Sequence, residues 1–322
     1  MSTVKNYLSL IRFSHTIFAM PFAMIGFFLG INYPFGVRMS QVGLRVGYNV
    51  AQVSLHHDQF NTNMEYARLF VLVVLCMVFA RSAAMAFNRW LDVKWDAMNP
   101  RTAIREIPRG IISKSSALRF VIFNCIAFIV CTWFINPVCF ALSFVALAVV
   151  LGYSYTKRFT PLCHLVLGVG LSLAPIGAYL AVTGHFALLP ILFSFAVIFW
   201  VSGFDIIYAL QDEEFDRSNQ LYSMPSWLGK TRALRVSELL HLLSTICVAA
   251  AGIYGSFGMV YWLGIAIFAG MLIYQHTIVK PDDLRRVNLA FMTANGIASV
   301  VFAALVIADL YIFPAELVRY AH

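Results

Sequence analysis

Charged residues are scarce in this chain. Asp, Glu, Lys and Arg make up 12% of its 322 residues, whereas apolar residues make up 61%. Because a soluble domain usually has about a quarter charged residues, this composition indicates an integral membrane protein. The ~10-residue alternation of an outer-membrane β-barrel is also missing. We therefore expect an all-α, polytopic membrane protein.

Paired cysteines and metal-ligand spacings are missing as well. We expect neither disulfides nor a cysteine metal site, because all six cysteines lie within or beside apolar stretches. The histidines show no metal-ligand spacing either. We interpret them, including His15 and His164 near helix ends, as structural residues.

Long apolar runs dominate what is present. Bilayer-spanning helices need roughly 17–25 residues, and charged residues cluster between runs of about that length. The sequence predicts nine such helices, in a single transmembrane domain, at 9–31, 67–87, 117–135, 138–153, 162–183, 188–208, 235–255, 259–277 and 289–313. The boundary between the third and fourth depends on Asn136-Pro137, so the count could also be eight or ten.

The distribution of Lys and Arg predicts the orientation. With nine helices and the N-terminus inside, 19 of the 23 Lys and Arg residues fall on the cytoplasmic side. This asymmetry and anionic lipid headgroups account for the net charge of +8, so no nucleic-acid partner is expected. Residues 1–8 are too short for a cleaved signal, and we expect the inner (plasma) membrane of a bacterium.

Two further features concern organisation. A faint repeat relates residues 9–153 to 162–277, with 289–313 as an additional last helix, and such duplication often places a site between the repeats. Residues 32–66 form a polar stretch without strong periodicity on the non-cytoplasmic side. We interpret it as an irregular loop, although a short interfacial helix near 37–48 would also fit.

Two acidic clusters follow long apolar runs. The first is Asn88-x3-Asp92-x3-Asp96, and the second is Asp205-x2-Tyr208-x3-Asp212-x3-Asp216. On an ideal helix each set falls on one face, so four aspartates from two helices can converge on one cavity. Mg²⁺ typically binds through one or two carboxylates together with substrate phosphates. We therefore predict that Asp92, Asp96, Asp212 and Asp216 bind Mg²⁺ that carries a diphosphate.

Basic and aromatic residues surround these clusters. Arg105 lies in a turn-rich segment after the first cluster, and Lys157 and Arg158 follow Tyr153-Ser-Tyr-Thr. A guanidinium or ammonium in these places can bind phosphate oxygens. A lipid diphosphate that ionises needs aromatic faces to stabilise the cation, and Tyr208 and Tyr153 are the candidates.

The same motifs resemble those of the UbiA superfamily of intramembrane aromatic prenyltransferases, in particular its 4-hydroxybenzoate polyprenyltransferase-like branch. The first motif runs from Asn88 to Asp96 and on to Arg105-Glu-Ile-Pro108, and the second runs from Asp205 to Asp216. Tyr153-Ser-Tyr-Thr-Lys157-Arg158 resembles the family's central loop. One departure is Gln220-Leu221 where the family often has Gly-Leu, so that this loop is expected to cap the site differently.

The resemblance implies a nine-helix bundle whose cavity opens sideways to lipid. It implies Mg²⁺ bridged between the Asp-rich motifs and a polyprenyl diphosphate. Asn88 and the four aspartates match metal and diphosphate positions, Arg105, Lys157 and Arg158 match basic helpers, and Asp205 and Tyr208 line the acceptor side.

We therefore predict Mg²⁺-dependent transfer of a polyprenyl group to an aromatic acid in quinone biosynthesis. The preferred acceptor is 4-hydroxybenzoate, with Arg12 as a partner for its carboxylate and Asp205 or released diphosphate as the base. A dihydroxynaphthoate of menaquinone biosynthesis is the close alternative. A prenyltransferase acting on haem, chlorophyllide or a glycerol lipid would share these motifs. A secondary transporter would also have many helices and buried acids, but its carboxylates would lie near the bilayer midplane.

Overall fold

The computed structural model describes residues 3–11, 19–32 and 59–313, and within them the protein is helical without a β-strand. Eight helices are long and apolar enough to cross a membrane, and α2 (Met20–Asn32) is a shorter apolar helix. The prediction of an all-α membrane protein with about nine spans is confirmed.

Apart from α3, which extends beyond its prediction at both ends, the spanning helices keep close to their predicted bounds. They are α3 (Gln59–Leu91), α5 (Lys114–Trp133), α6 (Pro137–Thr156), α7 (Cys163–Thr183), α8 (Leu188–Ala209), α11 (Lys230–Gly255), α12 (Met259–Ile278) and α13 (Asn295–Ile312). Short elements connect them: α1 (Thr3–Leu10), α4 (Val93–Met98), the 3₁₀ turn η3 (Leu210–Asp212), α9 (Glu213–Ser218), α10 (Met224–Leu228) and the π-helix η4 (Leu289–Ala294).

The predicted first helix, 9–31, is wrong in its bounds. Helix α1 ends at Leu10, Ile11 and Ala19 are turn residues, and α2 begins at Met20. The apolar run therefore does not correspond to one continuous helix. Its second part packs very closely on α7, because a Cβ at Gly26 would lie 1.9 Å from the carbonyl oxygen of Pro175.

The polar stretch before the second span is also shorter than predicted. Residues 59–66, expected in an irregular loop, form the first turns of α3. An ion pair between Glu65 and Arg68, one turn apart, supports this extension. The possible interfacial helix near 37–48 falls outside the described residues.

The boundary between α5 and α6 lies where the sequence places it. The side-chain oxygen of Asn136 accepts a hydrogen bond from the Cys139 N–H at 2.8 Å, as an N-cap residue does. Pro137 follows at the first helical position, where its missing N–H costs nothing. This pair separates two spans that composition alone would merge.

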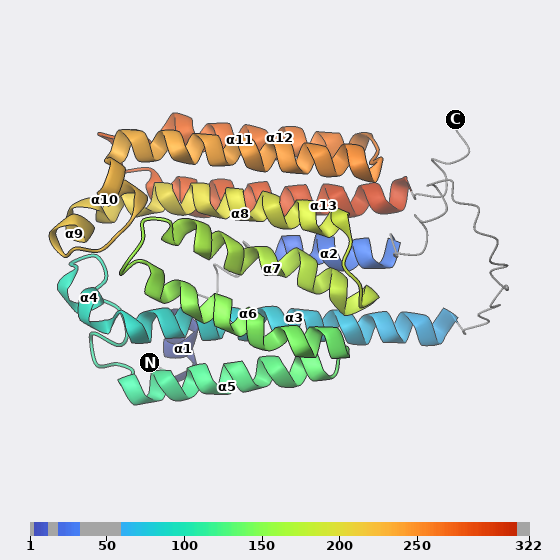
Figure 1. Ribbon diagram of the computed structural model, residues 1–322, viewed down its shortest axis with the longest axis horizontal. Coiled ribbons are helices and arrows are strands. Elements are labelled where there is room, and N and C mark those ends of the chain that lie inside the picture. The colour runs from blue at the N-terminus through green and yellow to red at the C-terminus, as the bar shows by residue number, and fades with distance from the viewer. Residues whose placement is uncertain (1–2, 12–18, 33–58, 314–322) are drawn as a thin grey trace.

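The helices form one bundle (Figure 1), and its largest core cluster combines aromatic with aliphatic side chains. Helices α8, α11, α12 and α13 lie on one side, α3, α5 and α6 on the other, and α2 and α7 between them. Trp200 on α8 is fully buried against Phe22 of α2 and Phe268 of α12. The short elements α4, α9 and α10 gather at one end of the bundle.

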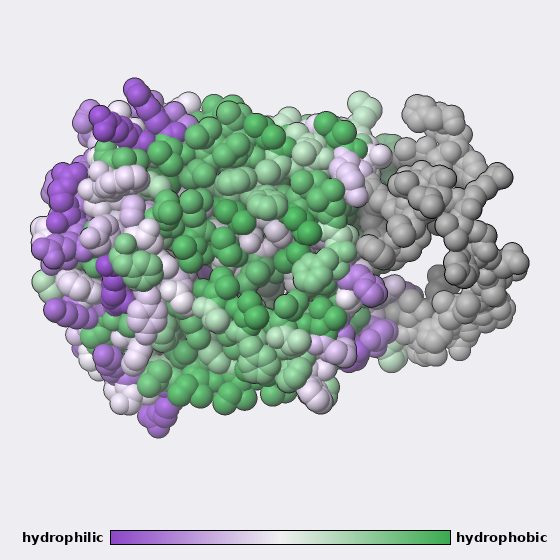
Figure 2. Space-filling model, in the orientation of Figure 1, coloured by the Kyte–Doolittle hydropathy of each residue, from purple (hydrophilic) through white to green (hydrophobic). Residues whose placement is uncertain are grey.

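The surface has the pattern of a membrane protein. Figure 2 shows a broad hydrophobic band across the middle of the visible face and hydrophilic residues concentrated at the end that carries α4, α9 and α10. Exposed apolar side chains along α5, such as Phe123 and Ile126, belong to this band. Such a large exposed apolar surface is unfavourable in water and favourable in contact with lipid chains.

Candidate active site

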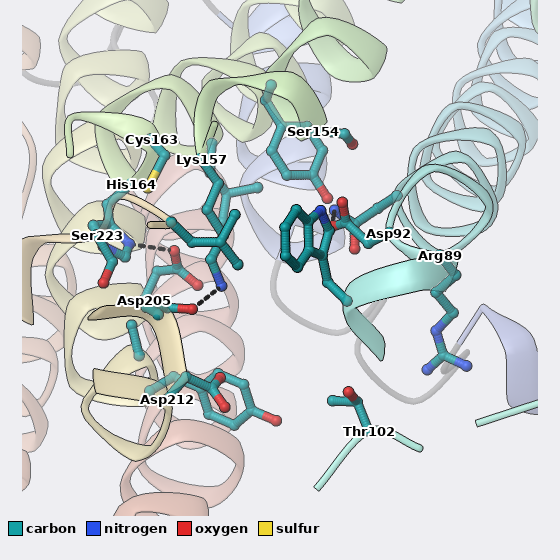
Figure 3. A pocket seen from close by; sticks show the side chains of 18 of the residues that line it. Arg89, Asp92, Thr102, Ser154, Lys157, Cys163, His164, Asp205, Asp212 and Ser223 are labelled. Carbon is teal, nitrogen blue, oxygen red and sulfur yellow. Dashed lines mark hydrogen bonds and ion pairs between the residues drawn. The ribbon is translucent and has the colours of Figure 1, made fainter. Parts of the chain in front are cut away.

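A cavity of about 280 Å³ opens at the hydrophilic end of the bundle. Its walls include both acidic clusters, the ends of α3, α6 and α8, and the start of α7. In Figure 3, Asp92 on one side faces Asp205 and Asp212 on the other. The two motifs, which are separate in sequence, therefore meet at a single site.

The first motif is not one uninterrupted helix, as the ideal geometry assumed. Helix α3 ends at Leu91, and Asp92 forms a joint before α4 begins at Val93. Backbone bonds from Asp92 N–H to Asn88 and from Asp96 N–H to Asp92 still follow the i→i−4 pattern. The three side chains consequently remain on one wall of the cavity, and Asn88 donates to Asp92 at 3.3 Å.

The second motif changes its winding in the same way. Helix α8 tightens into the 3₁₀ turn η3 at Leu210, and α9 follows from Glu213. Asp205 and Tyr208 belong to α8, Asp212 ends η3 and Asp216 lies on α9. All four line the cavity despite the change of helix type.

Four of the five aspartates in the cavity are each paired with a different cation. Arg105 bonds to both carboxylate oxygens of Asp96, at 2.7 and 2.9 Å. The remaining pairs are Arg158–Asp92 at 2.9 Å, Lys157–Asp216 at 2.7 Å and Arg101–Asp212, whose Nε–Oδ1 distance is 3.0 Å. The site therefore holds four negative and four positive charges in direct contact.

Arg101 connects the two motifs and was not among the predicted site residues. It follows the first acidic cluster, yet it binds Asp212 of the second and donates to the Tyr208 hydroxyl at 2.8 Å. Asn99 adds a bond to Asp212 at 3.0 Å. The turn-like sequence predicts a loop that folds back, but it does not reveal which arginine reaches across.

The loop that carries Arg101 and Arg105 is anchored from behind. Arg89, 4% exposed, forms an ion pair with Glu106. Glu106 also accepts a hydrogen bond from Ser9 of α1. This contact holds the loop against α3 and α1 and so keeps both arginines over the cavity.

Burial makes this a costly place for negative charge. Desolvation raises the pKa of Asp92 to about 6 in spite of the neighbouring Arg158. Asp216 is fully buried on α9. Carboxylates in such surroundings are stabilised by additional positive charge.

A second cavity, of about 360 Å³ and almost wholly apolar, adjoins the first. Arg81, Met85, Tyr153, Leu167 and Leu171 line both. From Tyr153 the second cavity follows α6 to Cys139, which at 1.5 Å per residue is about 21 Å. A polar pocket at the helix ends therefore continues into an apolar channel between the helices.

Arg81 lies where the two cavities meet. It belongs to the spanning part of α3, and its Nε is buried without a hydrogen-bond partner. Among the described residues it forms no ion pair with a carboxylate. Arg12, which we predicted to bind the acceptor's carboxylate, lies outside the described residues. An arginine inside an apolar run is the signal that points to Arg81 instead.

Asp205 differs from the other four aspartates. Within the described residues no Lys or Arg is paired with it, and its contact is His164 Nδ1 at 2.7 Å. His164, interpreted from the sequence as structural, in fact lines the cavity with Asp205. Tyr208 packs on Phe291 of η4 with ring centroids 4.4 Å apart and the ring planes tilted by 34°, which gives the site an aromatic wall.

The loop after α9 closes this side of the cavity. Gln220 has a φ of +55°, a conformation that glycine adopts more easily, and it occupies the place where the resemblance leads us to expect glycine. Tyr222 N–H then bonds to the Lys157 carbonyl at 2.8 Å. The backbone thus follows its path here without the glycine.

A comparison with known protein families identifies the chain. The model of the UbiA prenyltransferase family matches residues 57–297, which is most of the sequence. The chain belongs to the UbiA prenyltransferase family. It is a prenyltransferase, so the hypothesis of a secondary transporter is excluded, and its helical fold is the one the family predicts.

Individual UbiA relatives agree with this assignment. The 4-hydroxybenzoate octaprenyltransferase of Nitrosospira multiformis is 28% identical over 240 residues, covering 74% of this chain and 82% of that protein. An apo UbiA homologue from Aeropyrum pernix K1 superposes with a TM-score of 0.72 and 27% identity, covering 92% and 97%. A UbiA homologue from Archaeoglobus fulgidus bound to GPP and Mg²⁺ has a TM-score of 0.64 and 20% identity, covering 95% and 99%.

The aspartates of this UbiA protein are suitable ligands for a divalent cation that binds together with the diphosphate substrate. No group of three or more His, Cys, Asp or Glu side chains among the described residues forms a ready-made metal site. The aspartates instead supply one or two carboxylates from each motif, which suits Mg²⁺ when phosphate oxygens complete its coordination. Their burial, and the pKa of Asp92, favour an added cation.

Proposed function

We propose that this UbiA protein transfers a polyprenyl group from a polyprenyl diphosphate to 4-hydroxybenzoate, with Mg²⁺ as its cofactor. The observation that carries the proposal is the junction of the two cavities. A polar pocket with paired aspartates and cations opens at Tyr153 into an apolar channel. Such a site fits a diphosphate head with a long hydrocarbon tail, and the name of the Nitrosospira relative supports the acceptor.

The ion pairs account for how the diphosphate is held. Arg101, Arg105, Lys157 and Arg158 are now neutralised by aspartates. When a diphosphate enters together with divalent cations, these four side chains turn to its oxygens, and Asp92, Asp96, Asp212 and Asp216 bind the metal. Mg²⁺, when bound, neutralises the charge that develops on the departing diphosphate.

The apolar channel accounts for the rest of the donor. Its walls, from Met85 past Leu171 to Cys139, are almost free of polar atoms. Burial of the polyprenyl tail there keeps water away from the allylic carbon. Tyr208 and Phe291 offer aromatic faces to the positive charge that forms on that carbon.

Arg81 offers a binding partner for the carboxylate of an acidic acceptor. A buried guanidinium is stabilised by a carboxylate partner, and Arg81 faces the junction at which the prenyl carbon meets the acceptor. Binding of the 4-hydroxybenzoate carboxylate by Arg81 leaves the phenol ring near Asp205 and Tyr208. A cation inside a membrane span is costly and usually has a function, and binding of the acceptor's carboxylate gives Arg81 one.

The proposal is tested with purified protein, a radiolabelled polyprenyl diphosphate and Mg²⁺. We expect the labelled prenyl group to be transferred to 4-hydroxybenzoate when Mg²⁺ is present, and no transfer when the metal is left out. Product only with a dihydroxynaphthoate would replace the acceptor that we propose. Failure with both would contradict an aromatic acid as the substrate.

Substitution of Arg81 tests how the acceptor is recognised. In Arg81→Met we expect the KM for 4-hydroxybenzoate to rise about tenfold or more, because a charged hydrogen-bonding partner is lost. The preference for 4-hydroxybenzoate over its methyl ester should fall with it. Arg119→Met, on the exposed face of α5, is the matched control. An unchanged preference in Arg81→Met would show that Arg81 does not bind the carboxylate.

A further inference from the structure

A histidine joins Asp205 to the loop that closes the cavity. His164 is the second residue of α7 and is 3% exposed. Its Nδ1 lies 2.7 Å from Asp205 Oδ2, and its Nε2 accepts the backbone N–H of Met224 at 3.2 Å. One imidazole ring therefore touches both the acceptor side of the site and the start of α10.

These two contacts determine where the imidazole proton is. Nε2 can accept from Met224 only when it carries no hydrogen, so the ring hydrogen is on Nδ1 and is donated to Asp205. The ring is then neutral, and Asp205 accepts as a carboxylate. A neutral donor orients the carboxylate and leaves its negative charge in place. In the other four aspartates, by contrast, a paired Arg or Lys neutralises that charge.

The surroundings of His164 hold it rigidly in place. Ser202 of α8 donates to the His164 carbonyl at 3.1 Å. Ser223, beside it in Figure 3, closes a capping box with Ser226 that fixes the first turn of α10. Helices α7, α8 and α10 thus converge on this ring, which sets the position of the Asp205 carboxylate.

We propose that His164 is a positioning residue that aims the Asp205 carboxylate at the phenol of the acceptor, so that Asp205 receives the phenolic proton. The inference rests on the proposed function. As the prenyl C1–O bond breaks, its electron pair leaves with the diphosphate. The ring carbon ortho to the hydroxyl supplies the pair for the new C–C bond, and the O–H proton passes to Asp205.

The remaining proton transfer restores the aromatic ring. The ring carbon that has gained the prenyl group loses its hydrogen to the released diphosphate, and Asp205 returns its proton to the oxygen. The products are the prenylated phenol and protonated diphosphate, and Asp205 is again a carboxylate. His164 keeps its hydrogen throughout and acts only through Asp205.

Two substitutions separate positioning of Asp205 from anchoring of the loop. The side-chain amide of His164→Asn reaches the place of Nδ1 and can donate to Asp205, whereas that of His164→Gln reaches the place of Nε2 and can only hold Met224. We expect His164→Leu and His164→Gln to lower kcat about 10- to 100-fold, a part of what a general base contributes. His164→Asn should recover most of it, and the KM for the prenyl diphosphate should stay within about twofold in all three.

A more acidic acceptor provides a second readout. With 3-fluoro-4-hydroxybenzoate the phenol needs less help from a base, so the defect of His164→Gln relative to the unsubstituted protein should shrink. A purely structural role for His164 would leave that ratio unchanged. Equal kcat values for the Asn and Gln variants, or a ratio that does not change, would overturn the inference.

Binding measurements keep this test distinct from that of the proposed function. Calorimetry with geranyl thiodiphosphate and Mg²⁺ should give the same Kd for the unsubstituted protein and for each His164 variant. If the unsubstituted protein transfers no prenyl group to any hydroxybenzoate, the proposed function fails. If it does transfer and His164→Gln matches it, only the role of His164 fails.

Discussion

At the scale of single residues, Arg101 has the most contacts across the site. It binds Asp212 through two nitrogens and the Tyr208 hydroxyl through a third. Its guanidinium also lies 5.1 Å from the Tyr208 ring. Burial opposes the charge, but the contact with Asp212 outweighs it and raises the pKa of Arg101. The side chain is therefore a permanent cation between the two motifs.

Replacement of Arg101 by lysine should weaken donor binding although the charge is kept. Lysine presents a single ammonium and cannot reproduce a planar fork. The loss of one charged hydrogen bond, about 1.5–3 kcal/mol, corresponds to a Kd for geranyl thiodiphosphate about ten times higher or more, measured by calorimetry with Mg²⁺. Arg109→Lys, exposed in the same loop, should have no effect. Equal affinities for the two variants would contradict this role of Arg101.

At the scale of elements, the π-helix η4 shapes the aromatic wall. A π-turn leaves backbone carbonyls without their usual partners, and Asn295 donates to two of them, on Ala290 and Phe291, at 3.1 Å each. The oxygen of Asn295 accepts from Trp200 and Gln275. Three helices thus stabilise the wide turn that places Phe291 against Tyr208.

Substitution of Asn295 should disturb this wall. Asn295 Nδ2 also donates to Gln275 Oε1, so five side-chain hydrogen bonds are lost in Asn295→Ala. At about 0.6 kcal/mol for each hydrogen bond within a membrane, the loss amounts to about 3 kcal/mol, and the melting temperature in detergent should fall. Transfer activity should fall as well, because Phe291 is released from Tyr208. Asn124→Ala removes a buried asparagine of α5 that bonds within its own helix and should leave transfer unchanged. A normal kcat for Asn295→Ala would exclude a function for the π-turn.

The sequence is most informative about elements with strong local signals. Seven of the nine predicted spans agree with the structure to within a few residues, since apolar length and caps such as Asn136 act locally. The first two depart from it: the end of α1 at Leu10, the start of α2 at Met20 and the early start of α3 have no comparable signal. Helix winding at Asp92 and Leu210, and the π-turn, depend on tertiary contacts that periodicity does not reveal.

For the candidate site, too, the sequence predicts the features that depend on local spacing but not the contacts between distant segments. The spacing of the two motifs predicts that their aspartates share one cavity, and they do. The contacts across the cavity were not predictable from the sequence, because Arg101, Asn99 and His164 reach the site through packing between distant segments. Arg81 is different, since an arginine inside an apolar run is itself a signal. The predicted metal-binding roles of Asp92, Asp96, Asp212 and Asp216 stay predictions.

At the scale of the whole molecule, polarity is divided between the two ends. The end that holds the site carries the hydrophilic surface (Figure 2), and by the distribution of Lys and Arg we expect it to face the cytoplasm. In a cysteine-free variant, a cysteine at Ser113, beside α5 at this end, should resist a membrane-impermeant maleimide in intact cells. A cysteine at His185, between α7 and α8 at the other end, should react. The reverse pattern would invert the predicted orientation.

The central claim is that the two motifs bind one metal–diphosphate group together. Its most direct test is calorimetric binding of geranyl thiodiphosphate, with and without Mg²⁺, to Asp92→Asn, Asp212→Asn and the double variant. If the motifs share the ligand, each single substitution abolishes the Mg²⁺-dependent part of the affinity, and the double variant binds no more weakly than either single variant. Losses that simply add, or a single variant that keeps its full Mg²⁺-dependent affinity, would show that the motifs act separately and would contradict the account.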